Sequence, residues 1–159
     1  MEVQVNASAL TALAKRFKRE EEGKQYRKDL VTELRQAAGP GVSAVKESLR
    51  GIPSRGLAHP SPALGSFLAS KTAVQVRTSG QRAGVRVRIP QTPQVRGFKL
   101  AARRLNRGSW RHRVFGRDTW VTQRSPIPGF FDDELTRRAP EFRAGVVVAL
   151  RKAAARLSR

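Results

Sequence analysis

The sequence has no cysteine, two histidines and only 12 acidic residues among its 159 positions. The lack of cysteine excludes disulfides, zinc–thiolate sites and thiol nucleophiles. The longest apolar run, over residues 144–150, is far shorter than the roughly 20 residues of a membrane-spanning helix. The N-terminal residues also lack the basic and apolar segments of a signal peptide. We therefore expect a soluble chain with no membrane partner, forming one domain over residues 1–159.

Acidic residues are missing altogether from the middle of the chain. No carboxylate side chain occurs between Glu47 and Asp118, and residues 59–130 hold 14 basic residues against one acidic residue. The whole chain carries a net charge of +20. A solubilising coat is one interpretation, but such coats mix both signs. The excess therefore favours an anionic partner, which is either a nucleic acid or the acidic face of another protein.

The first 50 residues are predicted to form a helical arm, and residues 51–159 an α+β core. Gly39-Pro40-Gly41 is predicted to end the long first helix, with a short second helix over Val42–Arg50. The apolar stripe of the long helix is narrow, so we expect this helix to project or to pack against another subunit. The residues of the stripe recur at helical spacing: Leu10, Leu13, Phe17, Tyr26, Leu30 and Leu34.

Two antiparallel hairpins are predicted in the core. Residues 72–78 and 83–89 alternate apolar and polar side chains, which predicts Val76 opposite Val85, with the valines on one face. The other face then gathers arginines into a basic platform. In a second hairpin, over residues 110–115 and 120–123, Phe115 is predicted opposite Trp120 and His112 opposite Gln123, to which His112 would hydrogen-bond.

Further helices are predicted over residues 63–70, 97–106, 131–138 and 140–157. Gly108 is the predicted C-terminal stop of the helix over residues 97–106, and Pro140 suits the first turn of the helix over residues 140–157. This order predicts an α+β fold, in which antiparallel β-hairpins form a small sheet packed with helices, between a long N-terminal and a C-terminal helix. Seven of the ten aromatic residues lie within residues 98–142, where we expect the packed centre.

The sequence offers little for catalysis. His59 and His112 lie far apart in sequence, and two imidazoles alone make a poor zinc site. No common catalytic or nucleotide-binding motif occurs. The acidic cluster at residues 132–134 fits the positive end of a helix better than a divalent-metal site. We expect neither enzymatic activity nor a cofactor or metal.

The arginines between residues 77 and 117 could form one basic surface. No zinc finger, RNP motif, GxxG loop or basic zipper accompanies them. Trp110, Phe115 and Trp120 are expected to face the core or an interface, which leaves no exposed aromatic for base stacking. Any contact with nucleic acid is therefore expected to run through phosphates, without sequence specificity.

Residues 105–131 carry an ordered set of turn and aromatic positions. The set resembles the small neck and tail-completion proteins of long-tailed bacteriophages, a group similar to the lambdoid minor tail protein Z, whose sequences read W-x-H-P-V-F-G, then W-x-x-Q, then P-G-(W/F)-F. The similarity runs through most of the chain but is weak before Arg50, and Arg113 stands where the group has proline. The residues that carry it are Trp110, His112, Phe115, Gly116, Trp120, Gln123, Gly129 and Phe130.

The resemblance implies a structural protein of the virion, at the head–tail junction, that is present in the host cytoplasm during assembly. Such proteins are thought to form a ring, commonly sixfold or twelvefold, between the head-completion proteins and the tail terminator or tube. The implied partners are further copies of the chain, these neighbouring proteins and, without sequence specificity, phage DNA in the lumen. The first and last helices are expected to make many contacts between subunits.

A nonspecific nucleic-acid-binding protein with an arginine-rich surface is the alternative hypothesis. In both hypotheses the candidate contact residues are the same arginines, which would meet either DNA or an acidic protein face: Arg77, Arg86, Arg88, Arg103, Arg104 and Arg107.

Overall fold

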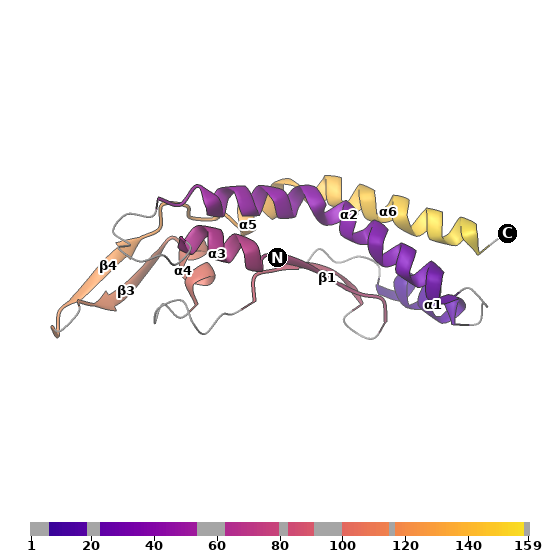
Figure 1. The fold of residues 1–159 in the computed structure, drawn as a ribbon, viewed down its shortest axis with the longest axis horizontal. Coiled ribbons are helices and arrows are strands. Elements are labelled where there is room, and N and C mark those ends of the chain that lie inside the picture. The colour runs from indigo at the N-terminus through magenta and orange to yellow at the C-terminus, as the bar shows by residue number, and fades with distance from the viewer. Residues whose placement is uncertain are drawn as a thin grey trace. The chain divides into compact units, whose positions relative to one another are not determined.

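The computed structural model describes residues 7–18, 23–53, 63–79, 83–90, 100–114 and 117–157 (Figure 1). In these ranges it contains six helices and two antiparallel hairpins, which confirms the α+β fold class. The hairpins form two separate two-stranded sheets rather than one small sheet. Within the same ranges, no helix is both long and apolar enough to cross a membrane.

Contacts divide the chain into two compact units that are interleaved in sequence. The first unit comprises residues 1–42, 73–88 and 136–159, and the second comprises residues 43–72 and 89–135. The expected boundary at residue 50 would separate the helical arm from the rest of the chain. In the structure, residues 1–42 instead share a unit with the first hairpin and the last helix.

The first unit contains α1 (Ala7–Phe17), most of α2 (Gly23–Arg50), β1 (Ala73–Arg77), β2 (Gly84–Arg88) and α6 (Ala139–Arg156). The narrow stripe of the N-terminal helices is buried inside this unit, so the expectation that it could not be covered within the chain is wrong. Helix α6 and the valine face of the hairpin supply the cover. The buried cluster consists of Leu10, Phe17, Leu30, Leu34, Ala38, Ala83, Val85, Val146, Ala149 and Ala153.

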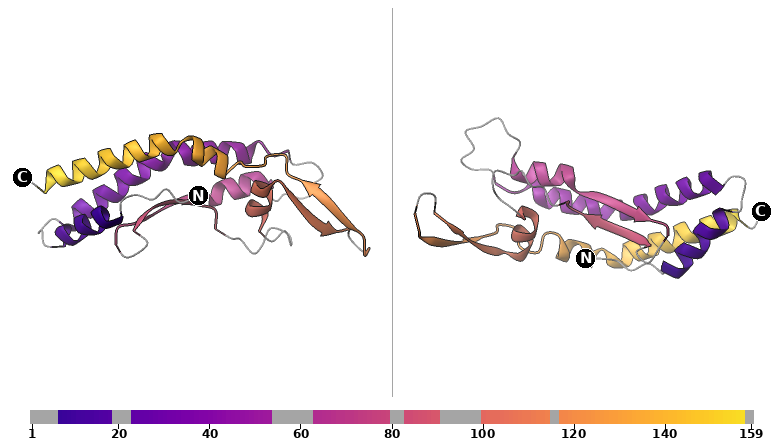
Figure 2. Two further views of the ribbon diagram at one scale, coloured as in Figure 1. Left: turned by 180° about the vertical axis from the view of Figure 1, so that it is seen from behind. Right: turned by 90° about the horizontal axis from the view of Figure 1, so that it is seen from below.

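Helix α6 packs directly on the first part of α2 (Figures 1 and 2). A Cβ atom added at Gly145 would lie 2.9 Å from the Cβ of Ala37, so the two helices meet with no room for a side chain. At its C-terminal residue, α6 places the Arg156 guanidinium 2.9 Å from a carboxylate oxygen of Asp29 and 3.4 Å from one of Glu33. These partly exposed ion pairs add little stability, and apolar burial holds the helix pair together.

Helix α2 continues through Gly39-Pro40-Gly41, where a helix end was predicted. The reason is an apolar stripe that stays in phase across this segment. At 3.6 residues per turn the stripe spans only about 100° of the helix surface. Its members, all buried, are Leu30, Leu34, Ala38, Val45 and Leu49.

The cost of Pro40 is reduced by where the residue lies on α2. Proline lacks the N–H that would bond the carbonyl of Gln36, four residues earlier. Both Gln36 and Pro40 are exposed, so water can satisfy the freed carbonyl. Burial of the stripe on both sides of Pro40 therefore outweighs a local signal that would end an isolated helix.

The first hairpin has the predicted register. Val76 pairs with Val85 and Val74 with Val87, so all four valines share one face. Val85 is fully buried, and Val74 and Val76 pack against the core cluster. The opposite face carries the arginines, as expected.

The second unit contains the end of α2, α3 (Leu64–Lys71), α4 (Ala101–Arg107), β3 (Ser109–Arg113), β4 (Trp120–Arg124) and the start of α5 (Asp132–Arg137). Aliphatic side chains supply most of its buried residues: Val45, Leu49, Leu68, Ala69, Ala101, Leu105, Phe130 and Leu135. The expectation of an aromatic packed centre is therefore wrong. Of the seven aromatics predicted there, Phe130 is buried and Trp120 is 52% exposed, whereas Phe98 and Phe115 lie outside the described residues.

The second hairpin forms where predicted but with a different register. Trp120 pairs with Arg113 rather than Phe115, and His112 lies opposite Val121 rather than Gln123. The bond from the Val114 amide to the Thr119 carbonyl, 2.9 Å long, continues this pairing. Each residue of β3 thus pairs with a residue two positions earlier in the sequence than the predicted partner. A shift by an even number of residues leaves each side chain on its predicted face.

Candidate functional site

The six arginines predicted as contact residues fall into two sets of three, one in each unit. Arg77, Arg86 and Arg88 lie on the polar face of the first hairpin. Arg77 and Arg88 are exposed and Arg86 is half-buried. The Arg88 guanidinium donates to the Gln75 side chain across the ribbon at 3.4 Å. This set can present cations to an anionic surface, in agreement with the predicted basic platform.

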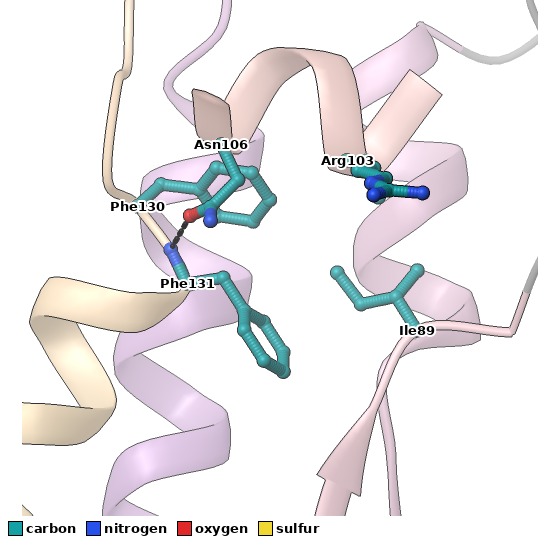
Figure 3. Close-up of a pocket in the computed structure, with 6 residues that line it drawn as sticks. Ile89, Arg103, Asn106, Phe130 and Phe131 are labelled. Atoms are coloured by element: carbon teal, nitrogen blue, oxygen red, sulfur yellow. Dashed lines mark hydrogen bonds between the residues drawn. The ribbon is translucent and has the colours of Figure 1, made fainter. Parts of the chain in front are cut away.

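The second set lies on α4, whose buried side is formed by Ala101 and Leu105. Arg103 and Arg107, one turn apart, are exposed, whereas Arg104 is half-buried. Arg103 stands at the rim of an open hollow of about 220 Å³ (Figure 3). The other residues that line the hollow are mainly apolar, which suits an apolar side chain of another molecule: Ile89, Ala102, Asn106, Phe130 and Phe131.

Asn106, at the end of α4, fixes the start of α5. Its side-chain oxygen accepts from the amide of Phe131 at 2.9 Å (Figure 3). The same oxygen accepts from the amide of Asp132 at 3.3 Å, and the amide nitrogen of Asn106 donates to the Asp132 carboxylate at 2.7 Å. Its backbone carbonyl accepts from Gly129 at 2.8 Å. Gly129 has a φ of 72°, in the left-handed region that favours glycine. This network gives Gly129 of the predicted motif a structural role, and Phe130 of the same motif is buried.

The hairpin of β3 and β4 begins directly after Gly108, which ends α4 as predicted with a φ of 91°. Its strands extend beyond α4 in both views of Figure 2. Every residue of β4 is exposed, and β3 alternates between exposed and half-buried residues. The described part of the chain therefore buries no strand residue of this sheet and leaves both of its faces at least partly exposed.

One face of this hairpin is cationic, and we call Arg111, Arg113, Arg124 and Trp120 the arginine–tryptophan face. The register places these four side chains on the same side of the sheet. The guanidinium carbons of Arg111 and Arg113 lie 5.8 and 5.6 Å from the centroid of the Trp120 ring. Since Trp120 is 52% exposed, it does not face the core of the chain, and its place at an interface with another molecule stays a prediction.

The opposite face carries no formal charge, and we call Trp110, His112, Val121 and Gln123 the neutral face. Trp110 and His112 are half-buried, whereas Val121 and Gln123 are exposed. Nδ1 of His112 lies 2.9 Å from the Arg113 carbonyl oxygen. The predicted hydrogen bond to Gln123 is therefore replaced by a local one, because Val121 takes the opposite position. Phe115 and Gly116, also part of the predicted motif, lie outside the described residues.

The acidic cluster occupies the first turn of α5, where Asp132, Asp133 and Glu134 meet the positive end of the helix. Asp132 is held by Asn106, as described above. Among the described residues, no group of three or more His, Cys, Asp or Glu side chains is arranged to hold a metal ion.

Helix α6 carries an exposed apolar patch formed by two valines. Val147 is 45% exposed and Val148 is 49% exposed, while their neighbours Val146 and Ala149 are buried. This follows from helical geometry, because a run of three consecutive valines cannot all face one side. Our sequence interpretation did not single out these valines, nor Arg111, Arg113 and Arg124 as a set with Trp120. The alternation of arginine along the second hairpin is the sequence signal that predicts the arginine–tryptophan face.

Comparisons with protein-family models, curated proteins and solved structures returned no match for this chain.

Proposed function

We propose that this protein is a structural subunit of a bacteriophage head–tail junction, where copies of the chain form a ring between the neck and the tail. The motif of residues 105–131 suggests this location. The expected partners are further copies of the chain and the adjacent head-completion and tail terminator or tube proteins. In this proposal the protein has a purely structural role, which is to join the head to the tail.

The observation that carries the proposal is the uncovered second hairpin. A two-stranded sheet is marginally stable alone and normally packs against a further strand or helix. The described part of the chain buries no strand residue of this hairpin, and Val121 on the neutral face is 37% exposed. A subunit whose hairpin is covered by a neighbouring protein accounts for this arrangement.

The exposed valines of α6, together with the neutral face of the hairpin, support a ring rather than a simple pair. Val147 and Val148 on α6 belong to one unit, and the neutral face of the hairpin belongs to the other. A twofold contact through one patch would leave the other patch exposed, whereas a contact between the two unlike patches covers both. Contacts between unlike patches are heterologous, and such contacts generate closed rings when the rotation between copies closes.

Inactivation of the gene in the phage or prophage that encodes the chain tests the proposal. DNA-filled heads and complete tails should accumulate unjoined, because the ring that links them is missing. The measurement is the count of joined and unjoined particles by electron microscopy. Joined, infectious particles at the normal count would overturn the proposal.

Complementation with variants adds a structural control. Val121→Glu and Val148→Glu each place a charge on a patch that assembly should bury, so neither variant should restore joining. Ser66→Glu changes an exposed residue of α3 by the same charge and should restore it. Full rescue by both valine variants would contradict the assignment of the two patches as contact surfaces.

A further inference from the structure

The arginine–tryptophan face has an excess of positive charge that its own hairpin does not neutralise. Residues 109–124 contain four arginines and one acid, Asp118. Asp118 lies 3.2 Å from the Arg113 guanidinium, but the two side chains are 92% and 62% exposed. Water and salt screen so open a pair, so Arg113 can exchange Asp118 for an external anion at little cost.

The geometry around Trp120 suits a ligand that has both phosphates and flat rings. A guanidinium group over an aromatic ring is attracted to the face of that ring, and its N–H donors remain at the edge of the guanidinium plane. Those edges can bind phosphate oxygens with two hydrogen bonds. About half of Trp120 remains exposed between the cations, and an exposed indole is a platform on which a base can stack.

We propose that the arginine–tryptophan face of the second hairpin binds single-stranded nucleic acid without sequence specificity. Arg111, Arg113 and Arg124 bind phosphates, and a base stacks on the exposed part of Trp120. An acidic protein surface would use the arginines equally well, but its carboxylates have no ring to stack on the indole. This inference is independent of the ring, since the neutral face and α6 carry the contacts proposed there.

Fluorescence of Trp120 provides the test, because the chain has only two tryptophans. In a Trp110→Phe variant, a 20-nucleotide oligo-dT should quench the emission of Trp120 as it binds. In the reciprocal Trp120→Phe variant, the emission of Trp110 should change little, because Trp110 lies on the opposite face. A 20-base-pair duplex should quench Trp120 less, since its bases are already stacked on each other. Binding of oligo-dT without any quenching of Trp120 would overturn the proposal.

Variants of the arginines separate a defined face from general charge. Arg111→Ala, Arg113→Ala and Arg124→Ala should each weaken oligo-dT binding several-fold and lower the slope of log affinity against log salt concentration by about 0.7. Arg143→Ala and Arg151→Ala remove the same charge from exposed positions of α6 and should change the affinity much less. Equal losses in both sets would show that net charge, rather than this face, binds the strand.

Variants of Trp120 isolate the stacking step. Trp120→Ala should weaken oligo-dT binding about tenfold, within the range that base–aromatic stacking supplies, and Trp120→Tyr should restore most of it. Polyglutamate of equal charge should bind the arginines without quenching Trp120, and it should compete more weakly than oligo-dT because it lacks the stacking contact. If polyglutamate quenched and competed as strongly as oligo-dT, the partner would be an acidic protein surface and the proposal would be wrong.

Discussion

Single side chains decide the local structure at the end of α4. Asn106 joins the last turn of α4 to the first turn of α5 through bonds to residues 25 and 26 positions away. A local sequence pattern cannot reveal this role, because helix caps are normally sought within a few residues of the helix start. The conformations of Gly108 and Gly129 are easier to predict, since both have a positive φ and glycine is the residue favoured at such positions.

Replacement of Asn106 by alanine should lower the free energy of unfolding by about 1–2 kcal/mol, the range for loss of a helix cap. The amide of Phe131 should then exchange faster with deuterium, because it loses its acceptor. Asn106→Asp should retain slow exchange at Phe131, since it keeps an acceptor oxygen, yet still lose stability through repulsion from Asp132. Unchanged exchange at Phe131 in the alanine variant would contradict the capping role.

At the scale of elements, burial determined which predictions succeeded. The register of the first hairpin could be predicted because Val74, Val76, Val85 and Val87 must share the buried face. The second hairpin is buried on neither face, so its apolar pattern did not fix the register, and the predicted pairing of His112 was wrong. The exposure of Trp120 was missed for the same reason.

Helix α2 shows how a long-range pattern can outweigh a local one. The Gly39-Pro40-Gly41 segment is a strong local stop signal, yet the buried stripe keeps its phase from Leu30 to Leu49. Extending the helical phase across the proline would have predicted one helix instead of two.

Pro40→Ala should therefore stabilise the protein, by about 1–2 kcal/mol, because it restores the hydrogen bond to the Gln36 carbonyl and removes a proline from a helix interior. The measurement is chemical unfolding, with helix content followed by circular dichroism. Pro140→Ala is the matched control. This proline lies in the first turn of α6, where its missing N–H has no helical partner, so stability should change little. A loss of stability in Pro40→Ala would show that α2 is interrupted there.

At the scale of the whole molecule, charge and uncovered surface are shared between the two units. The first unit holds 19 basic and 7 acidic residues, and the second holds 13 and 5. The strongly basic middle of the sequence is thus divided between them, a division that the linear sequence could not show because the units are interleaved. The apolar patches are divided in the same way, with α6 in one unit and the neutral face in the other.

Electron microscopy of the complete particle tests the central claim most directly. The account predicts a closed ring at the head–tail junction, with six or twelve copies of this chain, in which the neutral face of each second hairpin is covered by a neighbouring protein. A junction that lacks this chain, or a ring in which Val121 and Val148 of every copy face solvent, would contradict it.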